Sequence, residues 1–188
     1  MPQYKTSALL AVAACIALSG CAVQKITLDS PPTTKYTLKY SKVFIEDFTQ
    51  DRKVSANDVV WVNGWVPLFD GTRGPSPNKT MYRYMQDAFL PGSEINESLK
   101  VSLLDSSYLM EKGFADDMAF VSLIAGQRER GWKCTASMNV SNSQKSERKE
   151  FEVSERHAGF VEIEWLQEFT TRCRTQLVDS INGYLQRF

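Results

Sequence analysis

The residues with the clearest potential for chemistry are the four cysteines, and Cys21 has the most telling neighbours. It follows Leu18-Ser19-Gly20, and an aliphatic residue, two small residues and a cysteine form the lipobox of bacterial lipoproteins. Small residues fit the signal peptidase, and the thiol takes a diacylglycerol before cleavage frees its amine for another acyl chain. We expect Cys21 to be the lipidated first residue of the mature protein. The alternative is an ordinary secretion signal with a chance cysteine.

Residues 1–20 have the organisation of a cleavable secretory signal. Lys5 is the only charge before an apolar run from Ala8 to Leu18, which is shorter than the roughly 20 residues that a membrane-spanning helix needs. Two or three acyl chains anchor a protein stably, since each buried CH₂ contributes about 0.8 kcal/mol. Ala22 stands where an Asp would retain a lipoprotein in the inner membrane. The sequence therefore predicts attachment to the outer membrane, facing the periplasm.

Cys134 and Cys173 remain once Cys15 has left with the signal and Cys21 is lipidated. Disulfides persist in oxidising compartments, so this even pair favours a structural bond over two buried free thiols. Cys134 lies on the apolar face of a predicted strand and Cys173 on the apolar stripe of a predicted helix. The thiols meet if that helix covers that strand. Neither belongs to a Cys-x-x-Cys motif, so a redox-catalytic pair is not indicated.

The remaining polar side chains form no recognisable catalytic or metal-binding motif. His157 is the only histidine, and one imidazole with no cysteine at zinc-binding spacing does not make a zinc site. Asp116-Asp117 is interpreted as a turn, where Asp is favoured. The sequence contains no Gly-x-Ser-x-Gly elbow and no Gly-rich phosphate loop. We therefore expect no enzyme activity, no metal and no cofactor.

A Gly/Pro-rich stretch from Asn63 to Asn78 carries several large apolar side chains. Trp65, Leu68 and Phe69 lie in this stretch, which is long for a loop. Large apolar groups on a loop form either a partner-docking patch or a cap that folds back on the core. The sequence leaves both interpretations open.

Length and charge exclude several classes of protein. Removal of the signal leaves 168 residues (188 minus 20), enough for one domain with a substantial core. The 22 basic and 22 acidic residues balance, so nothing suggests nucleic acid as a partner. Residues 21–35 are expected to form a lipidated tether, because Pro31-Pro32 cannot be helical. Residues 36–188 are expected to form a single periplasmic domain.

Hydrophobic periodicity predicts an α+β fold for that domain. Segments with period-2 or continuous apolar patterns predict strands, and apolar stripes at three- and four-residue steps predict helices. We expect two long helices packed on one face of a largely antiparallel sheet, as a two-layer sandwich. The predicted strands are Tyr36–Phe48, Val59–Val62, Met118–Ala125, Trp132–Val140 and Glu150–Arg156, and the predicted helices are Asn78–Phe89, Ile95–Met110 and Val161–Phe188.

The segment from Ser41 to Phe48, followed by Asp51-Arg52, resembles part of a known group of lipoproteins. It is similar to the first core strand and the acidic-basic turn of small outer-membrane lipoproteins of the YajG-like group and the related CsgG-like α/β fold. A helix over Ile95–Met110 before a strand pair is also similar to that group, whereas the Gly/Pro loop after Val62 departs from it. The resemblance implies a fold and a location, and no defined reaction.

Three functions remain on the basis of the sequence. The first is a non-catalytic, membrane-anchored accessory subunit that binds a protein partner in an envelope assembly or transport machine. The second is a small-molecule or lipid-binding module with a groove between helices and sheet. The third and least favoured is an envelope hydrolase, because nucleophile, base and metal ligands are all unrecognised.

Overall fold

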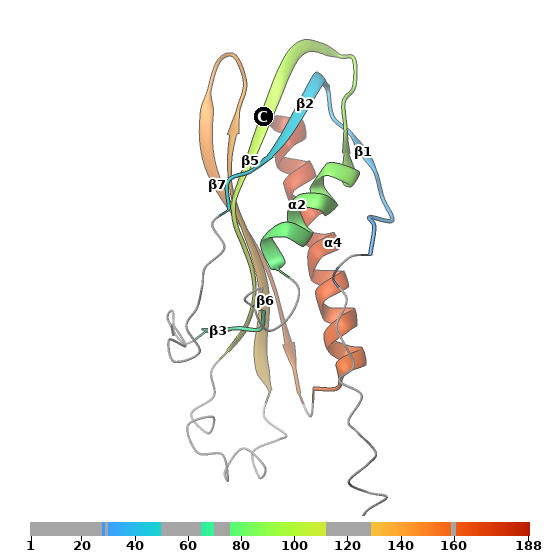
Figure 1. Cartoon of the computed structure of the whole chain (residues 1–188), viewed down its shortest axis with the longest axis vertical. Helices are drawn as coiled ribbons and strands as arrows, with labels where there is room; N and C mark the ends of the chain where they lie inside the picture. The colour runs from blue at the N-terminus through green and yellow to red at the C-terminus, as the bar shows by residue number, and fades with distance from the viewer. Residues whose placement is uncertain (1–27, 29, 50–64, 70–75, 112–128, 159–160) are drawn as a thin grey trace, which may run out of the picture.

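The computed structural model describes residues 28, 30–49, 65–69, 76–111, 129–158 and 161–188. Strands β2, β5, β6 and β7 form one sheet in that order, β3 pairs with β5, and β1 pairs with β4 in a separate small sheet. The expected α+β fold with a largely antiparallel sheet is confirmed (Figure 1). The elements are β1 (Tyr36–Thr37), β2 (Tyr40–Asp47), β3 (Trp65–Pro67), α2 (Pro77–Ala88), β4 (Phe89–Leu90), β5 (Ile95–Glu111), β6 (Arg130–Ser141), β7 (Ser146–His157) and α4 (Ile163–Arg187).

The β6–β7 hairpin follows the period-2 pattern predicted for it. Alternate β6 residues from Trp132 to Val140 are at most 2% exposed, whereas the residues between them are partly exposed. At the turn, the Asn142 carboxamide oxygen accepts hydrogen bonds from the backbone N–H groups of Gln144 and Lys145 at 3.0 and 2.9 Å. A side chain that bonds its own backbone in this way stabilises a tight connection.

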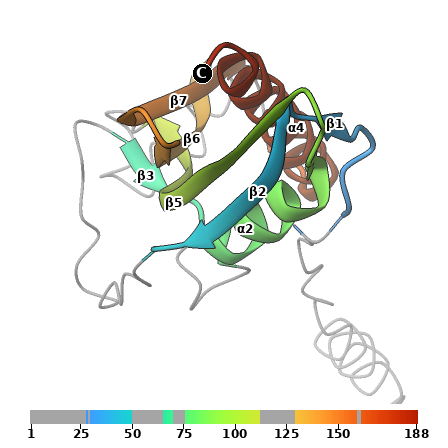
Figure 2. The same cartoon turned by 90° about the horizontal axis from the view of Figure 1, so that it is seen from above.

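Helices α2 and α4 cover the same face of the sheet, as Figure 2 shows. α4 packs against β6 and β7, and α2 packs against β2 and β5. α2 begins at Pro77, one residue before the expected start at Asn78, and Ser76 is the N-cap, whose hydroxyl accepts from the Lys79 N–H. Asn78 is buried instead, and its side chain accepts from the Ser106 N–H at 2.6 Å. Neither described helix combines the length and apolar character of a membrane-spanning helix.

The helix predicted over Ile95–Met110 is wrong, because this segment is the long central strand β5. Leu99, Val101 and Leu103 are fully buried and alternate with period 2. A bulge between Leu103 and Asp105 then shifts the phase by one residue, so that even-numbered residues such as Tyr108 face the core afterwards. A period-2 pattern with one inserted residue imitates helical spacing when it is read along the sequence.

Leu28, the first described residue, is 1% exposed and belongs to the core. Arg174 of α4 holds this part of the chain by donating hydrogen bonds to the Leu28 and Ser30 carbonyl oxygens. Most of residues 30–35, within the expected tether, are exposed. The strands predicted over Val59–Val62 and Met118–Ala125 lie outside the described residues.

Candidate functional site

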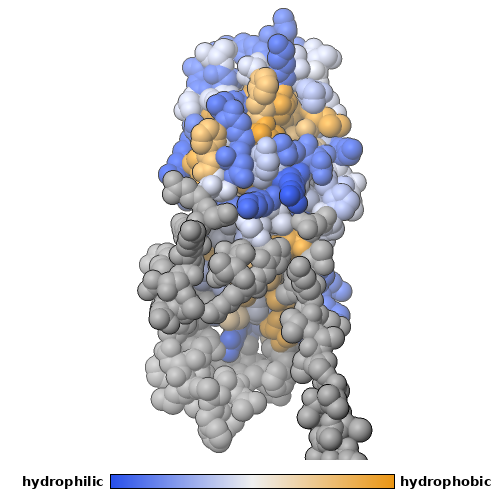
Figure 3. Space-filling model, in the orientation of Figure 1, coloured by the Kyte–Doolittle hydropathy of each residue, from blue (hydrophilic) through white to orange (hydrophobic). Residues whose placement is uncertain are grey.

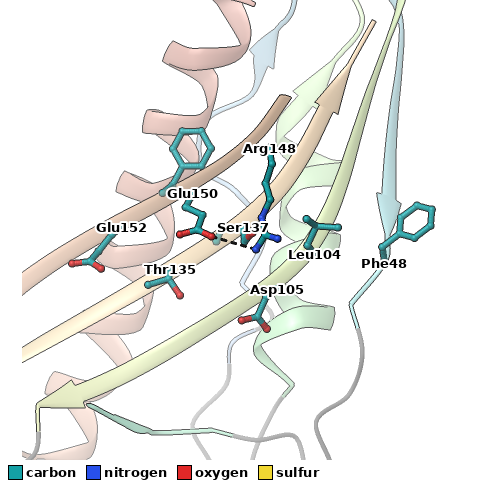
Figure 4. Close-up of a pocket in the computed structure, with 10 residues that line it drawn as sticks. Phe48, Leu104, Asp105, Thr135, Ser137, Arg148, Glu150 and Glu152 are labelled. Carbon is teal, nitrogen blue, oxygen red and sulfur yellow. Dashed lines mark hydrogen bonds and ion pairs between the residues drawn. The ribbon is translucent and has the colours of Figure 1, made fainter. Parts of the chain in front are cut away.

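The face of the sheet opposite the helices carries a hollow of about 690 Å³. Its lining is polar in the middle, where β6 contributes Thr135 and Ser137, and more apolar toward β2, where Phe48 lies (Figure 4). The residues that line it are Phe48, Leu104, Asp105, Thr135, Ala136, Ser137, Arg148, Glu150, Phe151 and Glu152.

The bulge in β5 helps to build this hollow. Asp105 pairs with Ser137 of β6, and Leu104 is the extra residue between two paired positions. A bulge redirects side chains at the point where it interrupts a ladder. Both Leu104 and Asp105 therefore contribute to the hollow. The Ser137 hydroxyl oxygen is buried and forms no hydrogen bond within the described part of the chain.

Two ion pairs balance most of the acidic charge around the hollow. Arg148 Nη2 lies 3.3 Å from Glu150 Oε1, and Lys133 Nζ lies 2.9 Å from Glu152 Oε2. The Arg148–Glu150 pair is largely exposed, so it is worth little to stability and can exchange partners readily. The Thr135 hydroxyl lies 2.7 Å from the Ser107 hydroxyl of β5. Charged and hydroxyl side chains therefore gather around the hollow.

Phe44 and Phe48 project from the β2 side of the same outer face, and we call them the aromatic edge. Their exposed fractions are 51% and 56%, whereas Val43 and Ile45, on either side of Phe44 in the strand, pack against the core. Lys100 pairs with Glu46 at 2.9 Å and lies over the Phe48 ring at 5.7 Å. In Figure 4, the Phe48 side chain lies at the edge of the hollow and points away from the polar side chains of Ser137 and Glu150.

The surface seen in Figure 3 shows small apolar groups separated by polar side chains over the described part of the chain. Charged groups flank the aromatic edge, because Lys100 pairs with Glu46 and lies over the Phe48 ring. Partly exposed aromatic residues with a polar rim are typical of protein-binding surfaces.

Cys134 and Cys173 are joined by a disulfide between β6 and α4, with their Cα atoms 6.1 Å apart. Both residues are 2% exposed. The bond links the sheet to its covering helix at the middle of the core, as expected if α4 covers β6. It is a structural bond in a buried position, far from the hollow on the other face.

The loop residues Trp65, Leu68 and Phe69 are folded back on the sheet. Trp65 belongs to β3, and the Lys133 ammonium lies 4.2 Å from the centroid of its ring. Phe69 is 8% exposed and packs edge-on against Tyr108, while Leu68 packs against the core. The structure places Leu68 and Phe69 against the core, as a cap would be. Trp65 instead lies beside Lys133 and Gly131 and is partly exposed.

His157 ends β7 and stacks on Trp165, with the ring centroids 4.0 Å apart. No cluster of three or more histidine, cysteine or acidic side chains suited to a metal ion occurs among the described residues. Cys21, Trp61 and Asp116-Asp117 lie outside those residues.

Sequence analysis missed the aromatic edge, because Phe44 and Phe48 were interpreted as part of a core strand. The alternation Lys42, Phe44, Glu46 and Phe48 was the available signal, since charged residues on the same face of a strand indicate solvent. It also missed Arg174, which is 2% exposed on the helical stripe otherwise formed by apolar residues.

The space between helices and sheet, where a ligand groove was considered, is filled by core side chains in the described structure. Met85, Leu103, Met138, Phe169 and Ile181 are fully buried there. A binding groove on that side is not favoured.

No model of a known protein family matches the chain, and no curated protein sequence matches it either. The helix that contributed to the resemblance with the YajG-like group is a strand, so the resemblance now depends on the Ser41–Phe48 segment and on Asp51-Arg52, which lies outside the described residues.

Proposed function

We propose that this protein is a non-catalytic lipoprotein, anchored to the outer membrane through Cys21, that binds a protein partner in an envelope assembly or transport machine. The aromatic edge carries the proposal: Phe44 and Phe48 are both more than half exposed beside a polar hollow. Burying one phenylalanine side chain in an interface contributes about 1.5–3 kcal/mol. Two such residues together can act as the anchoring centre of an interface.

The chemistry of the site supports binding over turnover. The Glu150 and Glu152 carboxylates beside the hollow are paired with Arg148 and Lys133. The disulfide between Cys134 and Cys173 agrees with an oxidising compartment such as the periplasm. The lipobox at Leu18–Cys21 supports the anchor.

The test uses a photoreactive phenylalanine analogue placed at Phe44 or Phe48 in living cells, with Leu90 as the matched control site. Leu90 is also a partly exposed apolar residue, at 39%, but it belongs to the separate β1–β4 sheet. We expect both edge positions to crosslink to the same envelope protein, and Leu90 not to do so. Equal crosslinking at all three positions would contradict the proposed docking surface.

The anchor is tested separately by Cys21→Ser. This variant should leave the membrane fraction, and mass spectrometry of the wild-type protein should find acyl chains on Cys21. A wild-type protein that carries no acyl chain would refute the lipoprotein assignment.

A further inference from the structure

Residues 28 and 30–37 form an N-terminal strap that runs along α4 in the same direction as the helix. Leu28 and Ser30 contact Arg174, the Tyr36 hydroxyl donates to Asp179, and the Gln186 side chain donates to the Thr37 carbonyl oxygen at 2.9 Å. The order of contacts along the strap matches the order along the helix. The N-terminal end of the strap, Leu28, therefore lies nearer the N-terminal end of α4 than Thr37 does.

Arg174 holds the strap firmly. Its guanidinium donates to the Leu28 carbonyl oxygen, to the Ser30 carbonyl oxygen at 3.2 Å and to the Ser30 hydroxyl at 2.6 Å. It also lies over the Tyr84 ring, 4.4 Å from the centroid. Hydrogen bonds from a charged donor are about twice as strong as neutral ones, and this donor is 2% exposed. Leu28 is thus a fixed point on the domain.

The chain between this fixed point and the membrane anchor is short. Seven peptide units separate Cys21 from Leu28, and they span at most about 25 Å. The helix from Arg174 back to Ile163 covers eleven residues, about 17 Å at 1.5 Å per residue. A lipidated Cys21 would consequently hold Leu28 within about 25 Å of the lipid headgroups, a distance that also allows the N-terminal end of α4 to reach them.

That end of the molecule exposes apolar side chains, which we call the proximal patch: Val161, Ile163 and Trp165. Val161 and Ile163 are 40% and 39% exposed, and Trp165 is partly buried against His157. α4 runs the length of the sheet, so the opposite end holds the C-terminus and the β6–β7 turn (Figure 1). Lys145 of that turn lies over the Phe188 ring at 3.8 Å. The two ends of the domain therefore differ in chemistry.

We propose that the proximal patch rests on the lipid headgroups of the membrane that holds Cys21, so that the β6–β7 turn points away from the bilayer. The inference depends on the proposed lipid anchor. Apolar residues with a tryptophan are typical of contacts at the membrane interface. Glu162 and Glu164 flank the patch and are exposed, which favours a zwitterionic over an anionic lipid surface.

The test places a fluorophore at either end of the full-length, lipidated protein. Ile163→Cys labels the proximal patch, and Ser143→Cys labels the β6–β7 turn as the matched control. The other mature cysteines are lipidated or disulfide-bonded, so the new thiol reacts alone. Each protein is reconstituted in phosphatidylcholine vesicles that contain a lipid with a nitroxide on its headgroup.

We expect quenching at position 163 to exceed quenching at position 143 by at least threefold. Val161→Glu, with the label at 163, should reduce the difference, because it adds a charge to the patch without touching the core. Equal quenching at the two positions would overturn the inference. So would quenching at position 163 that rises when phosphatidylglycerol replaces phosphatidylcholine, because that result contradicts a zwitterionic surface.

Arg174→Met tests the role of the strap. Release of residues 28 and 30–35 would lengthen the tether, so quenching at position 163 should fall toward that at 143, while circular dichroism confirms that the domain remains folded. Unchanged quenching in a folded variant would show that the strap does not orient the domain. Mass spectrometry of Cys21 separates the proposed anchor from the proposed orientation. A protein with no acyl chain on Cys21 would refute the anchor. A lipidated protein with equal quenching at positions 163 and 143 would refute only the orientation.

Discussion

Removal of the Cys134–Cys173 disulfide should cost this domain a large share of its stability. The bond closes a loop of 39 residues that contains most of β6, all of β7 and the first half of α4. Crosslinking restricts the unfolded chain, and the loop-entropy relation for this length corresponds to about 4 kcal/mol at 25 °C. Small domains have net stabilities of about 5–15 kcal/mol, so this contribution is substantial.

The experiment compares urea unfolding of the oxidised protein with that of Cys134→Ala/Cys173→Ala. We expect a loss of about 4 kcal/mol in the free energy of unfolding and a decrease in Tm of roughly 12 °C, since 1 kcal/mol shifts Tm by about 2–4 °C in a domain of this size. Both alanines occupy sites that are 2% exposed, so some of the loss reflects lost packing.

Addition of a reductant separates these two effects. The oxidised wild-type protein should lose stability when reduced, and the double alanine variant should not respond. Thiol labelling of unfolded, unreduced protein should modify neither Cys134 nor Cys173. A difference below about 1 kcal/mol between oxidised and reduced wild type would refute the loop-entropy reasoning, and labelling of both thiols would refute the bond itself.

Three further changes have expected outcomes that follow from contacts on the helix side of the sheet. Asn78→Ala removes the acceptor of the buried Ser106 N–H and should lower the free energy of unfolding by about 1–3 kcal/mol in urea titrations. Gly92→Ala would place a Cβ 2.1 Å from the Leu38 carbonyl oxygen, so thermal unfolding should show a destabilisation of about 1–3 kcal/mol, whereas an unchanged Tm would contradict the close packing. Burial raises the pKa of Tyr108 to about 12, so stability should decrease as the pH rises from about 10 through 12, and Tyr108→Phe should show a smaller decrease in urea titrations at each pH.

The elements with an uninterrupted pattern were predicted correctly from the sequence. β6 alternates without a break from Trp132 to Val140, and α4 keeps one apolar stripe from Leu166 to Phe188. Because each pattern places its cysteine on the buried side, the pairing of Cys134 with Cys173 could be anticipated as well. Regular hydrophobic periodicity indicates secondary structure even when only one sequence is known.

β5 was missed because its pattern is interrupted. The inserted residue at Leu104 moves the buried positions from odd to even numbers, and the spacing of Ile95, Leu99, Leu103 and Met110 then matches a helix. The local composition indicated a strand rather than a helix, since Val101 and Tyr108 are residues that favour strands. A bulge is stabilised by neighbouring strands, so its position cannot be read from the segment alone.

The sequence by itself determined the features that depend on residue type and local spacing. The lipobox before Cys21, the balanced charge, the α+β fold class and the cysteine pair all belong to this group. Only the tertiary structure shows which apolar side chains are buried in the core and which remain exposed to solvent. Phe69 is buried against Tyr108, whereas Phe44 and Phe48 are exposed.

The tertiary structure also shows that the chain near Leu28 packs against α4. Arg174 is buried because its donors meet acceptors of Leu28 and Ser30, which lie 146 and 144 residues away in the chain. The burial and the hydrogen bonds of a side chain depend on contacts between segments that are distant in the sequence. They are set by how the sheet and the helices enclose that side chain. No local pattern encodes such contacts, so the proposed docking edge and the proposed orientation of the domain depend on the folded chain.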